Sequence, residues 1–288
     1  MNGAEFTAFS AGRLLRQFGI KPRKGLGQNF LISEGVLRRI IDAADLSEQD
    51  VVIEVGAGLG TLTRYLAQQA DRVVALEVDQ RLLPLLHQTL ANNSRVEIVH
   101  GDVLAIQPED LVSGPYKVVA NLPYYITSAV LRHFLEARAK PSRMVVTVQR
   151  EVVERITAGP GQMSLLAVSV QFYGHPSVVT KVPPGAFYPS PQVHSAVLRI
   201  DLYERPPVEV EDVKKFFDVV RAGFSQRRKQ LRNSLSQGLD LPVRRVVDAL
   251  HRCGIDEKQR PQELSIEQWA LLCQELSEPD PDDQGVHS

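Results

Sequence analysis

Four consecutive residues, Asn121-Leu122-Pro123-Tyr124, combine the groups that hold a planar base. They follow the apolar run Val118-Val119-Ala120, as at the end of a buried parallel strand, where open α/β sheets bind their ligands. Asn121 offers a neutral side-chain carbonyl, the backbone beside Pro123 offers a second acceptor, and the Tyr124 ring can stack. The alternative is a strand that simply ends in a turn, because Asn and Pro are common turn residues.

A glycine-rich turn follows an earlier apolar run, Val51–Val55. Gly56, Gly58 and Gly60 stand at alternate positions, and an amphipathic segment that begins at Thr61 comes next. A strand, a glycine turn and a helix let a ligand approach the backbone closely. The spacing Gly-x-Gly-x-Gly differs from the Gly-x-Gly-x-x-Gly of dinucleotide-binding proteins.

Acidic residues end the next two predicted strands. Glu77 closes the strand 72–78, about 20 residues past the glycines, where an acid binds ribose hydroxyls. Asp79 competes for this role or caps the next helix. Asp102 follows the strand 96–99 and can accept an exocyclic amine or cap a turn. Taken together, these positions predict a nucleoside-binding sheet.

Further strands are predicted at 144–148, 165–172 and 196–202, for seven in all. Between the last two, prolines stiffen the loop 182–191. Its residues Phe187 and Tyr188 either supply a second aromatic wall for the base or cover a hydrophobic edge. Gln28 and Asn29, in a glycine-rich segment near the N-terminus, are either site residues or solvated loop amides.

Composition indicates an ordinary globular protein. The 288 residues are 43% hydrophobic and 23% charged. No apolar run approaches the ~18 residues of a membrane span, so we expect no membrane association. Cys253 and Cys273 have no partner at metal-ligand spacing; we expect reduced thiols, no metal and a cytoplasmic location.

The net charge of −1 conceals a basic body, because four acids lie in residues 278–288; without them the charge is +3. Past a linker at 204–207 the pattern becomes helical. Cations then cluster at Arg227, Arg228, Lys229 and Arg232, which predicts either phosphate contacts or a solvated face. We therefore expect a basic arm (1–30), a nucleoside-binding α/β domain (31–203), a helical domain (208–276) and an acidic, disordered tail (277–288).

These motifs resemble those of the ribosomal RNA adenine N6,N6-dimethyltransferases, and among them the bacterial 16S branch associated with kasugamycin sensitivity. The resemblance covers roughly residues 21–275 and rests on several segments. They are 27–31, 54–60, Glu77, 101–102, 121–124, 187–195 and 224–235. It implies a Rossmann-like class I methyltransferase fold, with a mostly parallel seven-stranded sheet and a small C-terminal helical domain.

The resemblance also implies a reaction. Methyl groups pass from S-adenosylmethionine to the N6 amines of two adjacent adenines in the 3′-terminal hairpin loop of 16S rRNA, in the assembling 30S subunit. A monomer is expected. The implied cofactor residues are Gln28, Asn29, Leu31, Gly56, Gly58, Glu77, Asp102 and Asn121. The implied catalytic residues are Asn121, Leu122, Pro123, Tyr124 and Phe187.

One position departs from the family pattern, since Tyr125 stands where a smaller polar residue is expected; this bears on the number of methyls transferred. Three other functions compete with the implied one. A nicotinamide dehydrogenase is disfavoured by the glycine spacing. A macrolide-resistance methyltransferase acting on large-subunit RNA is disfavoured by the segment 224–235. A non-enzymatic assembly factor is disfavoured by the intact Glu77, Asp102 and Asn121.

Overall fold

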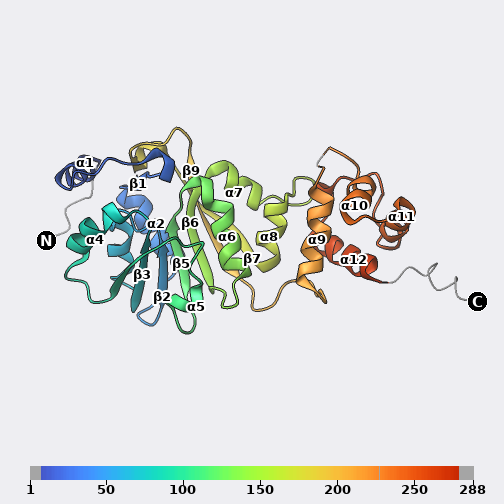
Figure 1. The fold of residues 1–288 in the computed structure, drawn as a ribbon, viewed down its shortest axis with the longest axis horizontal. Helices are drawn as coiled ribbons and strands as arrows, with labels where there is room; N and C mark the ends of the chain where they lie inside the picture. Colours follow the sequence, from blue (N-terminus) through green and yellow to red (C-terminus); the bar gives the residue numbers. More distant parts are fainter. Residues whose placement is uncertain (1–7, 227, 279–288) are drawn as a thin grey trace, which may run out of the picture. The chain divides into compact units, whose positions relative to one another are not determined.

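The computed structural model describes residues 8–226 and 228–278. The chain forms two compact units (Figure 1). Of the described residues, the first unit takes those up to Glu154 together with His175–Leu202. The second takes Arg155–Gly174 and those from Tyr203 onward. The division differs from the expected boundary at residue 203, because residues 155–174 belong to the helical unit. None of the described helices is long and apolar enough to cross a membrane.

A seven-stranded sheet organises the first unit, in the order β4-β3-β2-β5-β6-β9-β7. Its strands are β2 (Val51–Val55), β3 (Arg72–Glu77), β4 (Val96–His100), β5 (Lys117–Asn121), β6 (Arg143–Gln149), β7 (Gly174–Val182) and β9 (Ser195–Leu202). The pairs β2–β3, β3–β4, β2–β5 and β5–β6 are parallel, and β6–β9 is antiparallel. The mostly parallel seven-stranded sheet is thereby confirmed.

The strand register brings the chemically interesting residues to one edge. Val55, the last residue of β2, pairs with Leu76 on one side and with Ala120 on the other. Gly56, Glu77 and Asn121 each come one residue later, at the carboxyl end of three neighbouring strands. Parallel pairing therefore brings together three residues that lie far apart in the sequence.

Helices flank this sheet (Figure 1). They are α2 (Glu34–Ala44), α3 (Thr61–Leu66), α4 (Leu83–Leu90), α5 (Pro108–Leu111), α6 (Thr127–Glu136) and α7 (Arg150–Ile156). Apolar residues recur along α2 at helical spacing, and Val36, Leu37, Ile40 and Ile41 are buried there with the sheet residues Val119 and Val145. Burial of this face fixes α2 against the sheet.

The expected N-terminal arm is folded structure from Ala8 onward. Helix α1 (Ala8–Gln17) is followed by a 3₁₀ turn (Lys24–Leu26) and by β1 (Phe30–Leu31), which pairs antiparallel with β8 (Phe187–Tyr188). Ala11 and Leu15 of α1 are buried in a cluster with Phe30. Arg13 and Arg16 are thus carried by an amphipathic helix whose apolar side is packed, whereas Lys21, Arg23 and Lys24 follow that helix in the chain.

The strand predicted at 165–172 is wrong, because these residues form α8 (Leu165–Tyr173). Ser164 caps the helix by accepting a hydrogen bond from the backbone N–H of Ala167. A short apolar run fits a buried helix as well as a buried strand, and periodicity alone does not separate them. The seventh strand of the sheet is instead β7 (Gly174–Val182), whose residues do not form the apolar run or strict alternation that predicts a strand.

The second unit is helical, as predicted. It contains α8, α9 (Val213–Phe224), α10 (Leu231–Leu239), α11 (Val243–Arg252) and α12 (Ile266–Ser277). Phe172 stacks on Phe216 at a centroid distance of 4.8 Å, so α8 shares one core with α9. Trp269 lies against Gly223, where a Cβ would come within 2.4 Å of the indole ring. This close approach explains a glycine inside α9.

Candidate active site

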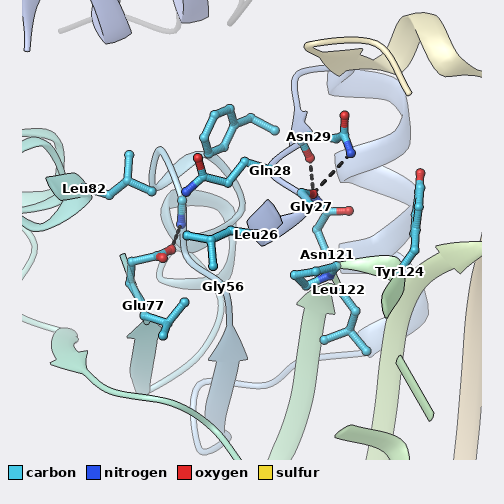
Figure 2. A pocket seen from close by; sticks show the side chains of 14 residues that line it. Leu26, Gly27, Gln28, Asn29, Gly56, Glu77, Leu82, Asn121, Leu122 and Tyr124 are labelled. Atoms are coloured by element: carbon cyan, nitrogen blue, oxygen red, sulfur yellow. Dashed lines mark hydrogen bonds between the residues drawn. The ribbon is translucent and has the colours of Figure 1, made fainter. Parts of the chain in front are cut away.

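A pocket opens at the carboxyl edge of the sheet, where the ends of three strands meet the segment 26–30 (Figure 2). It is lined by the glycine turn after β2, the tip of β3 and residues 121–124 after β5. Of the predicted site residues, it gathers Gln28, Asn29, Gly56, Gly58, Glu77, Asn121, Leu122, Pro123 and Tyr124.

The glycine turn forms the floor of this pocket. Gly56 and Gly58 have φ of 77° and 59°, in the left-handed region that favours glycine. A Cβ on Gly58 would lie 3.0 Å from Cδ1 of Phe30. A side chain at either position would therefore strain the backbone, and one at Gly58 would also fill the space against Phe30.

Glu77 is buried at the tip of β3 and braces the turn. Its Oε2 accepts a hydrogen bond from Gly58 N–H, and its Oε1 accepts one from Asp79 N–H, both at 2.8 Å. Burial raises the pKa of Glu77, while these two bonds to the carboxylate oppose the rise. An ionised carboxylate has about four acceptor positions, so Glu77 keeps acceptor capacity for a hydroxyl-bearing ligand.

The carboxylate of Asp79 is occupied by other partners on the protein. Its carboxylate pairs with Arg81 at 2.5 Å, caps the following turn and accepts from Nε2 of Gln28 at 2.8 Å. The bond from Arg81 lowers the pKa of Asp79 to about 2. Asp79 therefore fastens Gln28 and the segment 26–30 to the rim.

Asn121 is oriented by the backbone of Asn29. Its Nδ2 donates to the Asn29 carbonyl oxygen at 2.9 Å (Figure 2). The reverse orientation would set two carbonyl oxygens against each other. The bond therefore leaves Oδ1 of Asn121 as an acceptor at the pocket.

Tyr124 is held by a contact that sequence reasoning missed. Its hydroxyl lies 2.6 Å from Oγ of Ser195, a fully buried residue at the start of β9. Burial raises the pKa of Tyr124, so the phenol is neutral. A half-buried neutral ring fixed at its far end is a suitable stacking wall.

We predict that Tyr124→Phe and Ser195→Ala each slow the methyl transfer implied by the family resemblance several-fold, because each deletes a bond worth about 1 kcal/mol that fixes the ring. Steady-state rates for both variants and for their combination test this. The double variant should be no slower than the slower single one. Fully additive losses would show that the hydroxyl pair does not act as a unit.

Three expected site residues lie outside the pocket lining. Leu31 and Phe187 pair in the β1–β8 ribbon, and both are buried in a core cluster, Phe187 at 3% exposure. Asp102 is exposed, and its Oδ1 accepts from Leu104 N–H. Conversely, Leu26, Phe30, Val78 and Leu82 line the pocket without having been predicted. Their apolar side chains carried no chemical signal in the sequence.

The cations predicted to contact phosphates in the helical unit differ in whether they are already paired within the protein. Arg228 and Lys229 are exposed, whereas Arg232 pairs with Glu257 at 2.6 Å. Arg227 lies outside the described residues. Within the described ranges, no group of His, Cys, Asp and Glu could hold a metal ion.

Sheet order, glycine turn and pocket together define a class I methyltransferase. Similarity to solved structures agrees. The 23S rRNA methyltransferase ErmE superposes with a TM-score of 0.70 at 30% identity, covering 87% of this chain and all of that one. A Plasmodium falciparum dimethyladenosine transferase gives a TM-score of 0.73 at 23% identity, covering 84% of this chain and 95% of that one, and shows the same fold.

The family follows from the sequence comparison. Residues 19–278 match the model of the ribosomal RNA adenine dimethylases. The Ribosomal RNA small subunit methyltransferase A of Dehalococcoides mccartyi is 48% identical over 269 residues, 93% of this chain and 92% of the relative. That of Moorella thermoacetica is 43% identical over 91% of this chain and 95% of the relative. The chain belongs to the ribosomal RNA adenine dimethylase family and is an S-adenosylmethionine-dependent methyltransferase.

The pocket fits this cofactor. The left-handed glycine turn leaves a cradle that side chains would fill, and Glu77 presents a carboxylate beside it. When bound, S-adenosylmethionine supplies an activated methyl group on a sulfonium. The residues that would hold it are Gly56, Gly58, Glu77 and Asn121, with Gln28 and Asn29 closing one side.

Proposed function

We propose that this enzyme methylates the N6 amines of two adjacent adenines in the 3′-terminal hairpin loop of 16S rRNA, giving N6,N6-dimethyladenosines in assembling 30S subunits. The observation that carries the proposal is the oriented amide of Asn121 beside the fixed ring of Tyr124. The names of the bacterial small-subunit relatives support the choice of RNA. We also propose that it works as a monomer in the cytoplasm.

In this proposal the catalytic residues orient a weak nucleophile. The lone pair of an adenine amine is delocalised into the ring. An amine that donates to Oδ1 of Asn121 and to the Leu122 carbonyl becomes pyramidal and directs its lone pair outward. The Pro123 carbonyl is occupied by the N–H of Ile126, which makes Leu122 the backbone acceptor.

The remaining roles rest on the family resemblance. We propose that Gln28, Asn29, Leu31, Gly56, Gly58, Glu77, Asp102 and Asn121 bind the cofactor. Tyr124 forms one wall of the base pocket. Phe187 would form the second wall only if its ring left the core cluster when RNA binds.

The decisive experiment supplies labelled S-adenosylmethionine to undermethylated small subunits and, in parallel, to large subunits. The RNA is then digested and its nucleosides are identified. Dimethyladenosine from small subunits alone is the expected result. Label only in large subunits would contradict the choice of RNA, and no label in either would favour a non-enzymatic assembly factor.

We propose that the helical unit binds RNA through Arg227, Arg228, Lys229 and Arg232. Changing Arg227, Arg228 and Lys229 together to Gln should weaken RNA binding and flatten its salt dependence, by about 0.7–0.9 in log–log slope per lost phosphate contact. Binding assays at several salt concentrations measure this. Lys214→Gln with Lys215→Gln, in exposed cations of the same unit, is the control. An unchanged slope in the triple variant would make the cluster a solvated face.

A further inference from the structure

An exposed aromatic ring stands beside the base pocket. Tyr125 follows the pocket residue Tyr124 within the 3₁₀ turn Tyr124–Ile126. Its exposed fraction of 62% exceeds that of every other large apolar residue described. Exposing so much aromatic surface is unfavourable in water, and the pocket does not use this ring.

The ring lies against the segment that closes the pocket. A Cβ placed on Gly27 would be 3.5 Å from Cδ1 and Cε1 of Tyr125 and 3.1 Å from Cβ of Pro123. Gly27, with φ of 60°, brings its backbone close to both side chains. Tyr125 is therefore supported on one side and open to solvent elsewhere.

Positive charge gathers in the chain just before Gly27, the residue that contacts the ring. Lys21, Arg23 and Lys24 are exposed in the chain just before Gly27. An aromatic face next to several cations is the combination that binds single-stranded nucleic acid, by stacking on bases and contacting phosphates. An anionic peptide would use the cations but gains little from the ring.

The proposed reaction creates a base that needs such a surface. Drawing one adenine out of the loop and into the pocket removes a stacking partner from its neighbour. Single-stranded RNA bases splayed in this way stack on aromatic side chains. Tyr124 and Tyr125 are adjacent, with Cα atoms about 3.8 Å apart, so neighbouring bases can meet neighbouring rings.

We propose that Tyr125 is the stacking platform for the nucleotide next to the adenine undergoing methylation, with Lys21, Arg23 and Lys24 contacting the phosphates around it. This inference rests on the proposed function and adds a second base-binding position to it. Tyr125 binds substrate RNA and takes no part in the transfer itself.

The test measures initial rates on undermethylated small subunits over a range of subunit concentrations. Tyr125→Ala should raise KM for subunits about tenfold, as the loss of one base–aromatic stack predicts. Tyr125→Leu, which keeps apolar bulk without a ring, should behave like Tyr125→Ala. Tyr125→Phe should stay within about twofold of the native protein.

Two further measurements distinguish RNA binding by Tyr125 from an effect on cofactor binding or a general effect of removing an exposed tyrosine. Calorimetry should give the same affinity for S-adenosylmethionine in all variants, because the ring lies outside the pocket lining. Tyr203→Ala, which removes another exposed tyrosine, should leave KM unchanged.

The inference is overturned if Tyr125→Ala or Tyr125→Leu keeps the native KM while the native protein methylates small subunits. Weakened cofactor binding in these variants would also overturn it, by assigning the ring to pocket closure. Failure of the native protein to methylate any subunit would instead remove the proposed function, and the inference with it.

Discussion

Replacing Asn121 by alanine is expected to lower kcat for methyl transfer at least 10²–10³-fold, the usual loss when one preorganised polar group at a reacting centre is removed. Affinity for S-adenosylmethionine should change little. The physical reason is that the proposed cofactor site has several other contributors, including Glu77 and the glycine turn. The Oδ1 acceptor of Asn121, oriented by the bond from its Nδ2 to Asn29, is by contrast the only side-chain acceptor proposed for the adenine amine.

Calorimetric binding of S-adenosylmethionine and single-turnover transfer to undermethylated small subunits separate the two effects. Asn92→Ala, an amide removed from an exposed loop, should match the native protein in both. Equal loss of binding and transfer in Asn121→Ala would make Asn121 chiefly a cofactor ligand. Undiminished transfer would exclude it from the reaction.

The glycine turn, Glu77 and Asn121 could be predicted because local pattern and topology decide them. Each lies at or just past the carboxyl end of a short apolar strand, and parallel strands place their carboxyl ends at one edge. The register of β2 with β3 and β5 then brings these three positions next to one another. No knowledge of distant contacts was needed.

Other parts of the site depend on contacts between distant segments. Ser195 reaches Tyr124 across 71 positions in the chain, and a lone buried serine gives no sequence signal. The burial of Phe187 follows from its pairing with Leu31, which the proline-rich loop did not suggest. The apolar run of α8 likewise predicts a strand from the sequence, whereas in the fold it packs as a helix against distant residues such as Phe216.

The second large expected effect is on the pH dependence of stability, and it comes from Glu54. This glutamate, in β2, is 1% exposed, and its Oε2 has no hydrogen-bond partner among the described residues. Burial, with a smaller contribution from the nearby Glu77, raises its pKa from 4.5 to about 8. The native protein therefore holds Glu54 protonated at neutral pH, and the unfolded chain does not.

The consequence is a pH-dependent loss of stability. A carboxyl whose pKa is higher in the folded state stabilises the fold below the unfolded pKa of 4.5 and loses this contribution as pH rises towards about 8. Each pH unit within that window costs about 1.4 kcal/mol. At pH 7 the accumulated cost is about 3 kcal/mol.

Glu54→Gln keeps the shape of the side chain and cannot ionise. We expect it to raise the free energy of unfolding by about 3 kcal/mol at pH 7 and by less than about 1 kcal/mol at pH 5. Denaturant unfolding followed by circular dichroism across pH 5–8 measures this, with the exposed Glu136→Gln as control. Parallel pH profiles for Glu54→Gln and the native protein would mean that the carboxyl is ionised in the fold. Its unpartnered Oε2 would then need a cation or ordered water at the end of β2, because a buried charge without a partner is too costly to persist.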